Sequence, residues 1–177
     1  MNSFKEISPE MIRKNPFQMI GKDWMMITAG DENKVNTMTA SWGGLGVMYG
    51  KNAVFIVVRP QRYTKEFLDR EDTFSLSFLG KEYRKEMNYL GTVSGRYEDK
   101  IAKCGLTVER YEGTPYFSEA NHVLFCRKLY VQQFEGECIL EERFKSTFYS
   151  NMDYHYMYIA EVINAFQATR NKDKALQ

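Results

Sequence analysis

A continuous apolar run, Ala-Val-Phe-Ile-Val-Val at residues 53–58, constrains the fold most, and it ends abruptly at Arg59-Pro60. The run is short for a globular helix and rich in β-branched residues, so it predicts a strand buried on both faces. The other apolar segments are also strand-length, and they do not alternate regularly with long helices. This pattern argues against a doubly wound parallel sheet and favours a mainly β, antiparallel barrel, closed or partly closed, with short peripheral helices.

Hydrophobic periodicity predicts six or seven strands and several short helices. The expected strands cover residues 24–29, 35–42, 53–58, 73–79, 106–111, 122–134 and 156–163. The expected helices cover residues 4–13, 65–70, 81–90 and 98–104. Thr64 is expected to cap the second helix, and the Gly-Gly-Leu-Gly stretch at residues 43–46 is expected to interrupt the strand pattern.

Length, charge and cysteine content exclude several protein classes. The 177 residues contain no repeat and no linker-like stretch, which indicates one domain over residues 1–177. A formal net charge of +1 gives no reason to expect a nucleic-acid or membrane partner. No signal peptide or membrane-length apolar run is evident, and the three cysteines show no paired or zinc-type spacing, so we expect a reduced, cytoplasmic protein. The aromatic content of 15% fits either a filled β core or the walls of a planar ligand site.

Three polar segments lie where predicted strands end or predicted helices begin. Residues 36–42, Asn-Thr-Met-Thr-Ala-Ser-Trp, offer small hydroxyl side chains beside backbone that a ligand can approach. Residues 59–64, Arg-Pro-Gln-Arg-Tyr-Thr, place two arginines at a helix start, which suits a phosphate. Residues 94–100, Ser-Gly-Arg-Tyr-Glu-Asp-Lys, open another helix with donors and an acidic acceptor. Each segment has a plainer interpretation: a strand with surface hydroxyls, a solvated charged turn, and an ordinary acidic helix start.

Signatures of other enzyme classes are absent from the sequence. It contains no GxGxxG, no GxxxxGK[ST], no HExxH and no GxSxG. The two histidines, His122 and His155, lie on predicted strands without a cluster of further ligand residues. We therefore expect no metal site.

Five stretches, taken in order, resemble the flavin reductase-like family, the FMN-binding split β-barrels that include flavoredoxin. They are residues 37–44, 57–64, 74–78, 94–96 with 99–100, and 153–159. The similarity runs from about residue 20 to residue 165, which would be the core of the domain. It implies an antiparallel, Greek-key-like split β-barrel that binds FMN as a homodimer. An acidic residue is common in the family where Tyr97 stands, so this chain departs from the pattern there.

The resemblance also implies a set of cofactor-binding residues. Those lining the flavin ring and ribityl chain would be Thr39, Ala40, Ser41 and Trp42. Those surrounding the phosphate would be Arg59, Arg62, Tyr63 and Thr64. Those touching the ribityl side or completing the pocket would be Ser77, Phe78, Ser94, Gly95, Asp99 and Lys100. No catalytic side chain is implied, because the difficult chemistry belongs to the flavin.

The function implied by the resemblance is that of an FMN-binding oxidoreductase. The expected reaction is that of an NAD(P)H-dependent flavin reductase, in which NADH or NADPH passes hydride to flavin N5. The first alternative is a flavoredoxin-like FMN electron-transfer protein that is reduced by a partner and has no nicotinamide activity of its own. Two further alternatives are a barrel for another ligand, such as pyridoxal phosphate or haem, and a purely structural interaction barrel.

Overall fold

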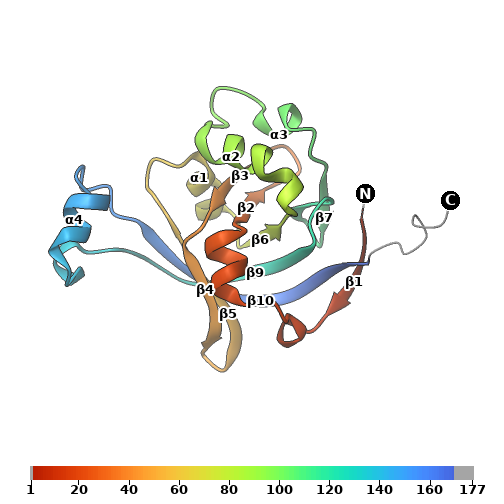
Figure 1. Cartoon of the computed structure of the whole chain (residues 1–177), viewed down its shortest axis with the longest axis horizontal. Coiled ribbons are helices and arrows are strands. Elements are labelled where there is room, and N and C mark those ends of the chain that lie inside the picture. Colours follow the sequence, from red (N-terminus) through yellow and green to blue (C-terminus); the bar gives the residue numbers. More distant parts are fainter. Residues whose placement is uncertain (1, 170–177) are drawn as a thin grey trace.

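A computed structural model describes residues 2–169 of the chain (Figure 1). Its strands are β1 (Ser3–Ile7), β2 (Met25–Gly30), β3 (Val35–Ala40), β4 (Gly43–Met48), β5 (Lys51–Val58), β6 (Thr73–Phe78), β7 (Val108–Tyr111), β8 (Thr114–Phe117), β9 (His122–Gln133) and β10 (Tyr156–Thr169). Its α-helices are α1 (Tyr63–Arg70), α2 (Arg84–Thr92), α3 (Lys100–Lys103) and α4 (Glu142–Phe148). Short 3-10 or π turns form at Pro9–Met11, Phe17–Lys22, Lys81–Tyr83 and Gly136–Cys138. The predicted mainly β, antiparallel fold with short helices is confirmed.

The strand order shows that the main sheet curls back on itself. It runs β3-β2-β6-β9-β10-β5-β4, and β1 pairs with the second half of β10. β3 and β4 stand at opposite ends of this order, yet only Ser41 and Trp42 separate them along the chain. Because so short a segment reaches about 10 Å at most, the two ends of the sheet must approach each other. The barrel is therefore split at Ser41-Trp42, where the two end strands meet without pairing.

Side chains from six strands, β2, β3, β5, β6, β9 and β10, fill the barrel. The apolar run at residues 53–58 lies within β5 and is buried except for Phe55, which is 44% exposed. Burial on both faces of this strand is thus confirmed at every position but one. The main core cluster includes Met25, Ile27, Val54, Ile56, Val58, Phe74, Leu76, Leu124 and Tyr158. Curling the sheet buries these side chains together, and this removal of apolar surface from water is the main stabilising contribution.

Two helices cover the end of the sheet formed by β2 and β3. Helix α1 buries Phe67 and Leu68, and α2 buries Met87 and Leu90. Both helices contact β3, which is consistent with their position over β2 and β3 in Figure 1. This packing brings the first turn of α1 beside Asn36, near the start of β3, and the last turn of α2 beside Thr39, near its end.

Three local predictions differ from the structure in how the strands pair. Residues 4–13 do not form a helix: β1 pairs with β10, from Ser3 opposite Thr169 to Ile7 opposite Ala165. Residues 43–46 do not interrupt the strand pattern but begin β4, which pairs with β5. The strand expected at 106–111 is shortened to β7, and β7 pairs only with the unpredicted β8.

An extended connection of residues 134–155, which we call the arm, joins β9 to β10. It carries α4, which Figure 1 shows apart from the sheet. No residue of α4 is buried, and Leu140 and Met152 on either side are strongly exposed. None of the helices within residues 2–169 is both long enough and apolar enough to span a bilayer.

Candidate functional site

Two adjoining cavities form a groove where the barrel is split. The first, which we call the basic cavity, has a volume of about 300 Å³ and is lined by Asn36, Met38, Arg59, Gln61, Arg62, Tyr63, Thr64, Thr92, Val93, Ser94 and Lys100. The second, which we call the Trp42 cavity, has a volume of about 190 Å³ and is lined by Met38, Thr39, Ala40, Ser41, Trp42, Val57, Arg59, Arg62 and His155. Met38, Arg59 and Arg62 line both cavities, so the two are neighbouring parts of one groove.

The basic cavity contains two partly buried cations without a carboxylate partner among residues 2–169. Arg62 donates to the carbonyl of Gly91. The Lys100 ammonium donates to the carbonyls of Leu90 and Val93, at 2.7 and 2.8 Å, and Lys100 is 3% exposed. Burial, with a smaller contribution from the charge of Arg62, lowers the pKa of Lys100 to about 8. Both cations hold their positions through neutral carbonyls, so a bound anion would be attracted to this end of the groove.

Thr64 lies at the wall of the basic cavity and does not cap α1 as the sequence predicted. The N-cap residue is Arg62, and its side chain makes no capping hydrogen bond to the helix. The Thr64 hydroxyl instead accepts a hydrogen bond of 2.9 Å from the side-chain amide of Asn36, on β3. The first N–H groups of a helix have no carbonyl partner within it, so the start of α1 adds donors to this region.

The Trp42 cavity has aromatic walls and a neutral histidine. Trp42 is 41% exposed, and the centroid of its ring lies 5.2 Å from that of His155 and 5.0 Å from that of Phe148. Nδ1 of His155 lies 2.8 Å from the hydroxyl of Tyr149. Burial, and secondarily the charge of Arg59, lowers the pKa of His155 to about 4. The imidazole is therefore uncharged near pH 7 and lines the cavity beside the Trp42 ring.

Arg59 connects the groove to the arm. Its guanidinium pairs with Asp153 and donates to the carbonyl of Phe148 at 2.7 Å. The amide of Gln61 also donates to Asp153, at 2.8 Å. Hydrogen bonds from Gln61 and Arg59 lower the pKa of Asp153. The arm therefore rests on the end of β5, and Arg59 already has an acidic partner.

The structure brings most of the sequence-predicted site residues to this groove. Those lining it are Thr39, Ala40, Ser41, Trp42, Arg59, Arg62, Tyr63, Thr64, Ser94 and Lys100. Ser77 and Phe78 do not line it: Phe78 lies in the core, and the Ser77 hydroxyl accepts from the backbone N–H of Phe117. The Asp99 carboxylate caps α3 by accepting from the backbone N–H of Ala102.

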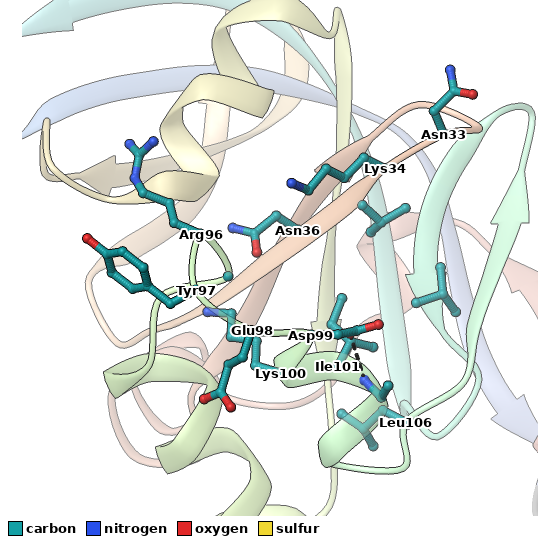
Figure 2. Close-up of a pocket in the computed structure, with 14 residues that line it drawn as sticks. Asn33, Lys34, Asn36, Arg96, Tyr97, Glu98, Asp99, Lys100, Ile101 and Leu106 are labelled. Atoms are coloured by element: carbon teal, nitrogen blue, oxygen red, sulfur yellow. Dashed lines mark hydrogen bonds between the residues drawn. The ribbon is translucent and has the colours of Figure 1, made fainter.

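Gly95 and Asp99 line a larger cavity of about 590 Å³ beside the groove (Figure 2). Asn36 and Lys100 line both this cavity and the basic cavity. The larger cavity is bordered by exposed, polar residues such as Lys34 and Arg96, and the figure shows the carboxylate of half-buried Glu98 directed away from Asn36. Its size alone does not favour it over the groove, where the buried cations and the aromatic wall converge.

Sequence reasoning missed Asn36 and His155 as residues of the groove. Asn36 belongs to the polar segment at residues 36–42, but its contact with Thr64 spans 28 positions of sequence. His155 lies in the last stretch of family resemblance, and only the packing of the arm brings it to Trp42. No group of three or more His, Cys, Asp or Glu side chains that could hold a metal occurs among residues 2–169.

Comparisons with solved structures identify the same architecture in known proteins. An FMN-binding domain of a flavin reductase-like enzyme from Shewanella baltica is 16% identical, with a TM-score of 0.69 over 94% of this chain and 78% of that one. Flavoredoxin from Methanosarcina acetivorans is 22% identical, with a TM-score of 0.66 over 82% of this chain and 68% of that one. An NADH:FAD oxidoreductase from Streptomyces globisporus is 20% identical, with a TM-score of 0.61 over 82% of this chain and 75% of that one. At these identities the likeness shows the fold, an FMN-binding split barrel.

Family membership rests on the sequence itself. No curated protein matches the chain. The model of the flavin reductase-like domain matches residues 19–176, which is most of the chain. The chain therefore belongs to the flavin reductase-like domain family.

Proposed function

We propose that the chain is an FMN-binding oxidoreductase that works as an NAD(P)H-dependent flavin reductase. The observation that carries the proposal is the pairing of a basic cavity with an aromatic-walled cavity in one groove. Arg62 and Lys100 lie at one end and have no carboxylate partner within the described residues 2–169, and Trp42 and His155 lie at the other end. FMN has the matching chemistry, with a flat ring at one end and a phosphate at the other.

The residues present fit this cofactor. Arg62, Thr64, Ser94 and Lys100 would hold the phosphate, since guanidinium, hydroxyl and ammonium groups are its usual donors. Ala40, Ser41 and Trp42 would line the ring where the two end strands meet. Arg59 lines both cavities and would lie between the two parts of the ligand. Bound flavin would supply the hydride acceptor at N5.

The chain itself would contribute position and exclusion of water rather than a reacting side chain. The contacts between Arg59 and the arm fix residues 148–153 beside the Trp42 cavity. His155 is neutral near pH 7, so the ring end of the groove would carry no histidine charge. Holding a nicotinamide against the ring in a fixed geometry is where such a site gains rate.

A direct test follows hydride transfer without oxygen. The purified chain, loaded with FMN, is mixed anaerobically with NADH or NADPH, and the flavin absorbance is followed. The proposal predicts bleaching by one or both nicotinamides, together with steady-state nicotinamide oxidation when an acceptor is present. Flavin that stays oxidised with both nicotinamides would contradict the reductase activity.

The second candidate is an electron carrier that a partner protein reduces. Flavoredoxin from Methanosarcina acetivorans is among the structural neighbours, as is the NADH:FAD oxidoreductase from Streptomyces globisporus. The same experiment separates the two functions. Bound flavin that neither nicotinamide bleaches, but that a chemical reductant does bleach, would favour the carrier.

We also propose that the chain forms a homodimer. Large apolar side chains are exposed on the β4–β5 hairpin and on the arm, among them Val47, Tyr49, Phe55, Leu140 and Met152. Exposed apolar side chains in such number favour burial of this surface against a second protein over its exposure to water. Light scattering at micromolar concentration should give twice the mass of the chain, and a monomer would contradict the proposal.

A further inference from the structure

Asn36 occupies an unusual position between three elements that surround the basic cavity. It is 4% exposed and lies on β3, which is an end strand of the sheet. Its amide nitrogen donates to the Thr64 hydroxyl of α1 at 2.9 Å. On the other side, a Cβ added to Gly95 would stand 2.2 Å from Oδ1 of the Asn36 side chain. Figure 2 shows Asn36 projecting from β3 towards the loop that carries Arg96. The close approach of this loop leaves the amide little room to move.

The direction of the hydrogen bond determines where the proton of Thr64 can go. A hydroxyl has one proton to donate and two lone pairs to accept with. Asn36 occupies one lone pair, so it cannot also receive the proton through the same contact. Thr64 is 1% exposed, and its hydroxyl donates to no acceptor among residues 2–169. Thr64 lines the basic cavity together with Arg62 and Lys100, so a ligand bound in this cavity would supply the acceptor for the Thr64 proton.

We propose that Asn36 is a positioning residue that makes the groove select a flavin with a phosphate over riboflavin. By donating to Thr64, it reserves the Thr64 proton for a phosphate oxygen held between Arg62 and Lys100. This inference rests on the proposed flavin-binding function. It assigns Asn36 a role in phosphate binding that is exerted through Thr64 and not through direct contact with the ligand.

The test compares the affinities of FMN and riboflavin, which differ only in the phosphate, for a set of variants. Asn36→Ala removes the donor, and Thr64→Val removes the hydroxyl. Asn36→Asp keeps the shape of the side chain but supplies only acceptors, so it would take the Thr64 proton. The matched control is Thr37→Val, in the same strand as Asn36 but away from the groove. It deletes the buried hydrogen bonds of the Thr37 hydroxyl to the Thr28 hydroxyl, at 2.9 Å, and to the Ile27 carbonyl, at 3.1 Å. Thermal unfolding of each variant shows that it folds.

We expect Asn36→Ala to weaken FMN binding about tenfold, as expected for one hydrogen bond to a charged group, and to change riboflavin binding less than about twofold. Asn36→Asp should weaken FMN binding further, because it also adds negative charge. In a Thr64→Val background, Asn36→Ala should change FMN affinity by less than about twofold, since the two residues act as one unit. Thr37→Val should leave the ratio of the two affinities unchanged.

Equal loss of FMN and riboflavin binding in Asn36→Ala would overturn the inference and assign Asn36 a purely structural role, and unchanged binding of both would also overturn it. An unmodified chain that binds FMN and riboflavin equally well would overturn the phosphate selectivity while leaving flavin binding intact. An unmodified chain that binds neither would overturn the proposed function itself, and this inference with it.

Discussion

Nδ1 of His155 lies 2.8 Å from the hydroxyl of Tyr149, and this contact fixes the imidazole against Trp42 at the ring end of the groove. Burial lowers the pKa of His155 to about 4, from an ordinary value near 6.5. Between these two values the unfolded chain binds a proton that the folded chain does not, so the stability contributed at this site falls as the pH drops from 6.5 to 4.

The first prediction is that His155→Gln removes this part of the acid sensitivity. The difference in melting temperature between pH 7 and pH 4.5 should be smaller in the variant than in the unmodified chain. Comparing the two proteins cancels the contribution of His122, whose pKa burial also lowers. Equal acid sensitivity in both proteins would show that His155 is not buried as a neutral group.

The second prediction concerns Lys100, whose pKa burial lowers to about 8. A phosphate beside the ammonium favours its charged form, so FMN binding should take up a proton. FMN affinity should therefore be constant below pH 8 and fall as the pH rises through 8, while riboflavin affinity should not. A phosphate monoester is already mainly doubly charged above pH 7, so titration of the phosphate itself contributes little to the change in affinity around pH 8.

Fluorescence titrations between pH 7 and 9.5 measure this effect. Lys100→Gln should bind FMN more weakly and without the pH dependence. Lys103→Gln, in the same helix but 61% exposed at its side chain, should behave like the unmodified chain. A Lys100→Gln variant that keeps the pH dependence would remove Lys100 from the phosphate site.

The third prediction tests the contact between Arg59 and the arm. Asp153→Asn removes the charge that Arg59 pairs with, so the backbone around Phe148 should open more often. Hydrogen exchange of residues 148–153 should speed up, while exchange in β9 stays slow. Glu142→Gln removes an exposed ion pair with Lys145 in the same arm and should have no such effect. Unchanged exchange in Asp153→Asn would show that Arg59 does not hold the arm.

The fourth prediction separates the core from the groove. The Ser77 hydroxyl is fully buried and accepts from the backbone N–H of Phe117 at 3.3 Å. Ser77→Ala should lower the free energy of unfolding by about 1–2 kcal/mol, because a buried donor loses its acceptor. FMN affinity should not change, since Ser77 does not line the groove. A loss of FMN affinity without a loss of stability would return Ser77 to the ligand site.

Local sequence patterns were sufficient to predict the fold class. The run at residues 53–58 became β5, and the alternation at Phe74, Leu76 and Phe78 became β6. These segments are rich in β-branched and aromatic residues, so their sequence alone predicts buried strands. The strand β1 could not be predicted within residues 4–13, because Ser8-Pro9 resembles a helix start. The pairing of β1 with β10 depends on residues about 160 positions away.

The site was predictable only in part, for a similar reason. The segments at residues 36–42 and 59–64 do meet in the groove, since Thr39 to Trp42 line it together with Arg59 and residues 61–64. The hydrogen bond that removes Thr64 from its expected capping role comes from Asn36 on another element. The partner of Arg59 comes from the arm, whose helix α4 was not predicted. Side-chain partners of this kind depend on the tertiary fold and leave no local pattern.

The measurement that tests the central claim most directly is a titration of the flavin-free chain with FMN, followed by flavin absorbance and fluorescence. We expect saturable binding of one FMN per chain and weaker binding of riboflavin. We also expect that Thr64→Val and Lys100→Gln each weaken FMN binding without unfolding the protein. A well-folded chain that shows no saturable change with FMN would contradict the assignment of the groove as a flavin site.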